Sequence, residues 1–195
     1  SFDTVVGNKV FLSAAKTDLT SGGDSVDLSA LVLSAAGGVA ENVPVSFSLV
    51  NPNEKGVVLN PAHLASDANG KAKTTLSLQN ITGYDPSNHT IQVKAAIGSG
   101  ADYSEQIISL NVTGTTLDLT AANSSVKTGA KPVVSASLKN GKGLAITGDS
   151  VKFTSSDVID LATGAVLNKT VKDSDDGSVD GNFVLNNIQV STAST

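Results

Sequence analysis

The stretch GGVAENVPVSF (residues 37–47), followed downstream by DANGKAKTTLSL (residues 67–78), decides the fold. In each segment a turn rich in glycine and asparagine precedes a run in which apolar and polar residues alternate. Alternation with a period of two is typical of a half-buried β-strand. Asn-Gly forms tight turns because both residues tolerate positive φ. The two segments therefore predict turns that lead directly into strands, with no helix between them.

Both segments occur a second time. Residues 143–153 read GLAITGDSVKF and residues 174–188 read SDDGSVDGNFVLNNI, and the spacings are 143 − 37 = 106 and 174 − 67 = 107. A third pair, LSAAKTDLTSG at 12–22 and LTAANSSVKTG at 119–129, repeats at the spacing 119 − 12 = 107. This spacing exceeds the roughly 20–50 residues of a solenoid repeat, so the sequence predicts two tandem copies of one domain.

The repeat sets the expected domain boundaries. We expect one domain at 9–114, a second at 115–195, and the end of a preceding repeat or a linker at 1–8, because SFDTVVGNKV (1–10) resembles ISLNVTGTTL (108–117). The first copy continues through residues 89–114, and the second has no counterpart of that stretch. The sequence therefore predicts a piece of a longer array whose second domain lacks its last strands, equivalent to two strands.

The predicted fold class is all-β. Short alternating segments separated by turn signals, at about seven strands per 100 residues without helical periodicity, are typical of an antiparallel β-sandwich. The alternation predicts inward-facing side chains in the first copy and counterparts in the second. These are Val45, Phe47, Leu76, Leu78, Ile91 and Val93, with Val151, Phe153, Phe183 and Leu185 as the counterparts of the first four.

The motifs resemble a known family. Gly-x-x-small-x-[Gly/Asn]-x-x-Val-x-Phe, then Asp-x-[Asn/Asp]-Gly and an alternating strand, is similar to bacterial immunoglobulin-like (group 1) repeats of invasin- and intimin-type surface adhesins. The first copy matches over nearly its full length, whereas the second departs at Ser174, where the family prefers Asp. The resemblance implies two tandem Ig-like domains at the bacterial cell surface. It carries over no receptor-binding residue, because receptor binding in such adhesins generally belongs to a distal domain.

Composition excludes several function classes. All 13 basic residues are lysines, the net charge is −5, and aromatic residues make up only 4% of the chain. Nucleic-acid binding uses a basic surface with arginine forks and stacking aromatics, so we expect no nucleic-acid partner. No apolar run approaches the roughly 20 residues that span a bilayer, so we expect no membrane insertion of this fragment. We expect a monomer.

Catalytic signals are absent. There is no cysteine, and the two histidines, His63 and His89, lie in loop-like contexts that indicate surface residues. Two histidines without paired spacing cannot fill a typical zinc site alone. The close carboxylate pairs, Asp24 with Asp27 and Asp157 with Asp160, are interpreted as solvated surface charge. We therefore expect no enzymatic activity and no cofactor.

One acidic stretch raises the question of calcium. DSDDGSVDGN (residues 173–182) places Asp173, Asp175, Asp176 and Asp180 close together. An EF-hand needs Gly at position 6 and Glu at position 12, whereas Gly177 and Val184 fall at positions 5 and 12. The alignment instead places Asp176-Gly177 on the Asn69-Gly70 turn. We expect a solvated patch and no metal, with a weak calcium site as the alternative.

The predicted function is a structural stalk or spacer that presents a distal binding domain of an adhesin, with neighbouring repeats as partners in the same chain. One alternative is an Ig-like binding module whose loops recognise a glycan or a host-cell receptor directly. Another is an incomplete Ig-like subunit of the pilus type, completed by a strand in trans across an open sheet edge.

Overall fold

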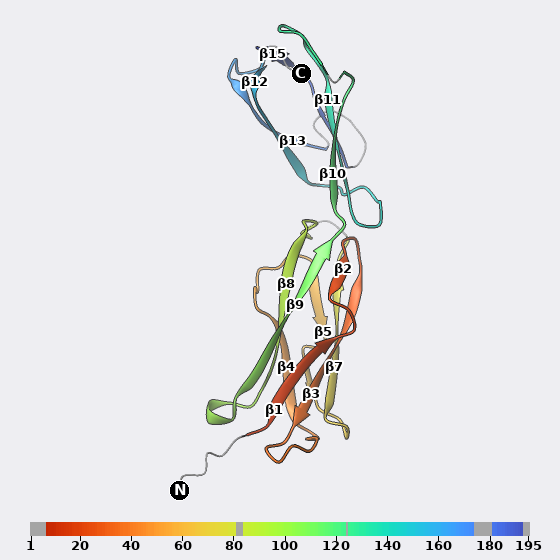
Figure 1. Ribbon diagram of the computed structural model, residues 1–195, viewed down its shortest axis with the longest axis vertical. Helices are drawn as coiled ribbons and strands as arrows, with labels where there is room; N and C mark the ends of the chain where they lie inside the picture. Colours follow the sequence, from red (N-terminus) through yellow and green to blue (C-terminus); the bar gives the residue numbers. More distant parts are fainter. Residues whose placement is uncertain (1–6, 81–83, 124, 174–180, 193–195) are drawn as a thin grey trace. The chain divides into compact units, whose positions relative to one another are not determined.

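The computed structural model describes residues 7–80, 84–123, 125–173 and 181–192 (Figure 1). The chain divides into two compact units, here termed domain 1 and domain 2, with the boundary in the sequence between Gly114 and Thr115. Apart from one 3-10 turn at Gly100–Asp102, the named elements are β-strands. Among the described residues, no helix is long and apolar enough to cross a membrane.

Domain 1 consists of two sheets. One has the strand order β1-β3-β7-β5, formed by β1 (Lys9–Ala14), β3 (Ser25–Leu33), β7 (Lys71–Leu78) and β5 (Val57–Asn60). The other has the order β2-β9-β8-β4-β6, formed by β2 (Asp18–Thr20), β9 (Ser104–Thr113), β8 (His89–Ile97), β4 (Pro44–Leu49) and β6 (His63–Ala65). This division of the strands between two sheets is that of an Ig-like sandwich, which confirms the predicted fold class.

One strand pair departs from the antiparallel pattern. The chain leaves the first sheet after β1 and joins the second as β2, which pairs in parallel with β9. All the other paired strands of domain 1 are antiparallel. Sequence alternation cannot reveal strand direction, because side chains alternate between faces in both arrangements.

The core of domain 1 lies between the sheets and is aliphatic apart from Phe47. The predicted inward residues Val45, Phe47, Leu76, Ile91 and Val93 are all at most 3% exposed, while Leu78 is partly buried at the edge of the cluster. In β1 and β3 every second residue is buried. The period-two pattern therefore places one face of each strand in the core.

Domain 2 also has two sheets, with the orders β10-β11-β14 and β13-β12-β15. Their strands are β10 (Thr116–Ala121), β11 (Val134–Lys139), β14 (Asn182–Leu185), β13 (Val166–Lys172), β12 (Ser150–Asp160) and β15 (Ile188–Val190). The buried cluster includes the four predicted core residues Val151, Phe153, Phe183 and Leu185.

The turn before β14 corrects one predicted equivalence. In domain 1 the Val32 amide donates to the Gly70 carbonyl at 2.7 Å, and in domain 2 the Leu138 amide donates to the Gly181 carbonyl at 2.8 Å. Both glycines have positive φ, +75° and +70°, and a Cβ on either would meet the carbonyl oxygen of Val32 or Leu138 at 2.7 or 2.8 Å. The counterpart of Gly70 is therefore Gly181, and the prediction of Gly177 is wrong.

The register of β14 agrees with this correction. Phe183 pairs with Ala136 as Ala72 pairs with Ala30, so Phe183 corresponds to Ala72 and not to Leu76. By the same register Leu185 corresponds to Thr74, not to Leu78. The true spacing at this point is 181 − 70 = 111 and not 107, because domain 2 has four additional residues before this strand.

The last described strand is the start of a counterpart of β8. β15 pairs with β12 as β8 pairs with β4, and both strands contain Ile-Gln-Val, at 91–93 and 188–190. The separation of Ala72 and Ile91 is 91 − 72 = 19, but that of Phe183 and Ile188 is only 188 − 183 = 5, so this connection is much shorter in domain 2. The expected deficit of two strands is thus revised: β8 has a partial counterpart, and no described residue of domain 2 forms a counterpart of β9.

Candidate functional site

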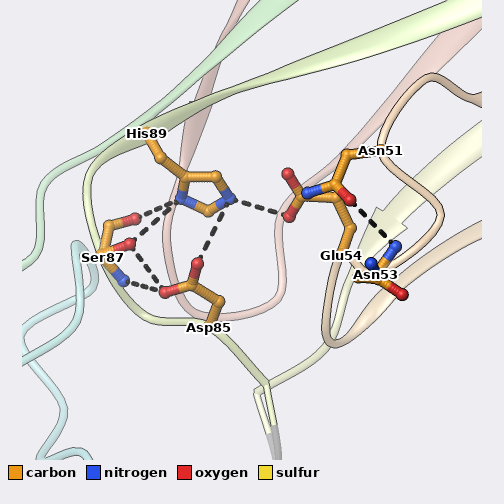
Figure 2. Close-up of polar contacts among 6 residues, drawn as sticks. All are labelled: Asn51, Asn53, Glu54, Asp85, Ser87 and His89. Atoms are coloured by element: carbon orange, nitrogen blue, oxygen red, sulfur yellow. Dashed lines mark hydrogen bonds and ion pairs between the residues drawn. The ribbon is translucent and has the colours of Figure 1, made fainter.

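Two connections between the sheets of domain 1 meet at a polar cluster (Figure 2). Glu54 lies in the connection from β4 to β5, and Asp85 and Ser87 lie in the connection from β7 to β8, with His89 as the first residue of β8. Among the described residues, only Glu54, Asp85 and His89 form a group of three titratable side chains with metal-ligand spacing. We term these three residues the His89 cluster.

The imidazole of His89 is held from both sides. Its Nε2 lies 3.1 Å from Glu54 Oε2 and 3.7 Å from Asp85 Oδ2, and its Nδ1 lies 2.6 Å from the Ser87 carbonyl oxygen. The Glu54 side chain is only 8% exposed and that of His89 20%. Carbonyl and carboxylate oxygens only accept hydrogen bonds, so both ring nitrogens donate. This geometry fits the imidazolium form of His89.

The electrostatics agree with that assignment. Burial on its own lowers the pKa of His89. The hydrogen bonds to the Ser87 carbonyl and the Glu54 carboxylate, together with the charges of Asp85 and Glu54, outweigh burial and raise the pKa above its ordinary value. Desolvation raises the pKa of Asp85, but hydrogen bonds from Ser87 and the charges of His89 and Lys55 lower it overall.

Backbone contacts bring the two connections together. The Gln79 amide donates to the Gly56 carbonyl at 2.7 Å, and the Asp85 amide donates to the Lys55 carbonyl at 3.2 Å. Gly56 has φ +74°, and any Cβ at this position would collide with Tyr84. Together with the His89 cluster, these contacts fasten two loops that cross between the sheets at one end of the sandwich.

The cluster superficially resembles a hydrolase triad, because Ser87 Oγ lies 3.4 Å from His89 Nδ1. A general base must accept the proton of the nucleophile, and here Nδ1 donates to the Ser87 carbonyl instead. The Ser87 hydroxyl donates to Asp85 Oδ1 at 2.7 Å. The arrangement therefore activates no serine and is best described as an ion-pair clip.

The same three side chains could hold a cation. Their ligand atoms all lie within 4.8 Å of one another. The Nδ1 contact with the Ser87 carbonyl is the kind of outer contact that orients a metal-bound histidine. Binding would first require loss of the Nε2 proton, because only the neutral imidazole is a ligand. The hydrogen bonds already present satisfy all three groups without a metal.

The candidate calcium residues are only partly described. Asp173 accepts a hydrogen bond from the Gly148 amide at 3.1 Å, which fixes a loop without requiring a cation. Asp175, Asp176 and Asp180 lie outside the described residues, so the expectation of a solvated patch stays a prediction.

The other titratable residues named above serve local structure. His63 is an exposed ring whose Nδ1 is hydrogen-bonded to Ser46 Oγ at 3.2 Å. Asp24 pairs with Lys16 at 2.9 Å and caps the Thr20 and Ser25 amides. Asp160 is only 7% exposed and accepts from the Ala162 amide, so its interpretation as solvated surface charge is wrong.

Sequence reasoning missed the His89 cluster. Asp85 and Ser87 carry a local signal, since an Asp two residues before a Ser often forms an Asx turn, and the Ser87 amide does donate to Asp85 Oδ1. Glu54 lies 35 residues before His89 and has no such signal. Only the crossing of the two loops brings it to the ring.

Comparison with known proteins gives similarity only among solved structures; no family model and no curated protein matches. The D0-D1 domain pair of intimin is 15% identical over 95% of this chain and 85% of its own, with a TM-score of 0.41. The D00-D0 pair of intimin is 22% identical over 57% of this chain and 50% of its own, with a TM-score of 0.42. The Yersinia pseudotuberculosis adhesin InvE is 12% identical over 93% of this chain, with a TM-score of 0.49, and the chain spans 51% of its length.

These identities and TM-scores are low, so the fold rests on the strand order of domain 1 and on the repeated motifs. Both features are those of an Ig-like sandwich. The chain therefore has a tandem Ig-like β-sandwich fold, and its repeated motifs resemble those of invasin- and intimin-type repeats.

Proposed function

We propose that this chain is a pair of non-enzymatic spacer domains from the stalk of a bacterial surface adhesin. The observation that carries this proposal is the difference between the two copies. The strand scaffold recurs in domain 2, but Asp85 and Ser87 lie in the connection that is much shorter there, with a separation of 5 (188 − 183) in place of 19 (91 − 72). Among the described residues, the strand scaffold is repeated in domain 2 and the His89 cluster is not, as expected of a spacer.

The parallel pair in domain 1 supports a mechanical role. β2 follows the start of the chain and β9 ends the domain, and they are joined by bonds such as Ser21 N–H to the Thr113 carbonyl at 3.0 Å. Tension on the two chain ends pulls parallel strands in opposite directions along their axes. Their evenly spaced hydrogen bonds are then loaded together and not one after another.

In this proposal the partners are neighbouring repeats of the same polypeptide, and the location is the bacterial cell surface. The fragment inserts into no membrane, binds no nucleic acid and is a monomer.

Single-molecule pulling tests the mechanical role. The native chain has no cysteine, so introduced cysteines define the pulling points. Tethers at Asn8→Cys and Gly114→Cys load β2 and β9 in shear, whereas tethers at Asn8→Cys and His63→Cys peel β6, an edge strand. We expect a clearly higher unfolding force for the first pair. Equal forces for the two pairs would contradict a load-bearing role.

A binding module is the second candidate. Tyr103 is 44% exposed on domain 1, and a tyrosine ring with an accessible face is a common contact for glycans and proteins. One similar structure, invasin, is described as a bacterial integrin-binding protein; it is 14% identical, and this chain spans 34% of its length. Saturable binding on a glycan array or to host cells, lost in Tyr103→Ala, would favour this function over the spacer.

A further inference from the structure

The first strand of domain 2 exposes residues whose counterparts in domain 1 are buried. Leu117 and Leu119 are 56% and 70% exposed, whereas Val10 and Leu12, at the same positions of the repeat, are 2% and 8% exposed. All six residues of β10 are exposed, although β1 alternates between buried and exposed. The apolar side chains of β10 are therefore not covered by another strand in the described part of domain 2, although those of β1 are covered in domain 1.

In domain 1 that cover includes β9. The Val10 amide donates to Ser104 Oγ at 3.2 Å, and the Leu12 amide donates to Gln106 Oε1 at 2.8 Å. β9 also pairs with β2, where Leu19 is fully buried opposite Val112. The strand β9 therefore contacts β1, lies between β2 and β8 in the second sheet and covers this side of the core.

Domain 2 has an apolar cleft on this side. Its volume is about 390 Å³, and its lining includes residues of both sheets. Six of them are Leu119, Val126, Phe153, Val158, Leu185 and Ile188. Val126, the counterpart of the fully buried Leu19, is only half-buried.

We propose that this cleft is the docking site for one further β-strand with the apolar alternation of β9, supplied by the polypeptide that continues β15. The occupant follows from the internal repeat, because β8 and β9 form an antiparallel pair with nine residue pairs in register and β15 is the start of the β8 counterpart. The inference goes beyond the spacer role and does not depend on it.

Part of the edge of β15 is already occupied. The Gly129 amide donates to the Val190 carbonyl at 2.8 Å, and the Val190 amide donates to the Ala130 carbonyl at 2.9 Å. In domain 1 the corresponding edge, at Val93, pairs with Ile108 of β9. Docking therefore exchanges these two hydrogen bonds for a longer ladder and buries Leu117 and Leu119. Because the exchange keeps Val190 bonded and gains apolar burial, the docked strand is favoured.

A chimera tests the proposal. The spacing of Ile188 and Ile91 is 188 − 91 = 97, so Thr195 corresponds to Gly98. Appending a copy of residues 99–114 directly after Thr195 places the β9 sequence in register. We expect amide hydrogen exchange at Leu117 and Leu119 to slow at least about 100-fold, because the appended copies of Ser104 and Gln106 would accept these amide hydrogens as they do those of Val10 and Leu12 in domain 1. The chimera should remain a monomer.

The matched control carries Asp at the positions of Leu110 and Val112 in the appended copy only. Domain 1 is unaltered, and the chain length is the same. Because aspartate side chains cannot replace the two apolar side chains in the core, exchange at Leu117 and Leu119 should remain fast in this control. Protection in the chimera and its loss in the control support the proposal.

Unchanged exchange at both leucines in the chimera would overturn it. A stable dimer of the unextended chain in sedimentation, with Leu117 and Leu119 already protected, would also overturn it, because the occupant would then be a second copy.

Discussion

His89 is the residue where structure adds most to the sequence of domain 1. Its ring is held by two carboxylates and a carbonyl, so its charge is linked to folding. The folded pKa of His89 lies above the unfolded value of 6.5, so its contribution to stability is complete below that pH and is lost as the pH rises through the folded pKa. The pKa shift of Asp85 has the opposite sign. Its folded pKa lies below the unfolded value of 3.8, so its contribution to stability is complete above pH 3.8 and is lost as the pH falls through the folded pKa.

We therefore expect domain 1 to be most stable at mildly acidic pH and His89→Gln to remove the alkaline decline. At about pH 6 the variant should lose about 1.5–3 kcal/mol of unfolding free energy, the range for a hydrogen bond to a charged group. Denaturant unfolding at several pH values, followed by tyrosine fluorescence, measures this because both tyrosines, Tyr84 and Tyr103, lie in domain 1. His63→Gln is the matched control, and an equal effect there would contradict the clip.

Gly181 gives a second prediction for a single residue. Its φ is +70° and a Cβ would meet the Leu138 carbonyl oxygen at 2.8 Å, whereas Gly164, with φ +72°, has nothing within 4 Å. Gly181→Ala should cost domain 2 at least about 2 kcal/mol and Gly164→Ala about 1 kcal/mol, because only the first adds a collision to the strain of positive φ. Hydrogen exchange of the β14 amides compares the two. Equal costs would mean that the turn is not closed at Gly181.

At the scale of the elements, the register of β14 explains how the core of domain 2 is filled. Phe183 stands where domain 1 has Ala72 and is fully buried. Phe183→Ala should leave a cavity and cost about 3–5 kcal/mol, enough to unfold a small domain. Circular dichroism should then show loss of β-structure in the variant, whereas Ala72→Gly in domain 1 should cost only about 1 kcal/mol. A variant as stable as the wild type would contradict the assigned register.

The strands themselves were predictable from alternation, but their alignment between copies was only partly so. A constant spacing of 107 placed Gly177 on Gly70, because the sequence has an Asp-Gly dipeptide at that position as well. The hydrogen bond from Leu138 to Gly181 shows that domain 2 has four more residues before β14. Loop lengths vary at little energetic cost, so low sequence identity could not locate this insertion.

At the scale of the whole molecule, the two domains differ in how completely their cores are covered. Domain 1 has an apolar cluster that extends over all its long strands, whereas β10 of domain 2 is exposed along its length. We expect two unfolding transitions in calorimetry, with domain 2 at the lower temperature. The upper transition should coincide with that of residues 7–114 expressed alone. A single cooperative transition for both domains would contradict this expectation.

The sequence by itself determined the all-β class, the two copies and most of the core, because a period-two pattern and turn residues are local properties of the chain. The tertiary structure decided the parallel pairing of β2 with β9, the true register of β14 and the contact of Glu54 with His89. Each of these depends on which segments lie side by side, and residues distant in sequence come together only through the packing of the sheets.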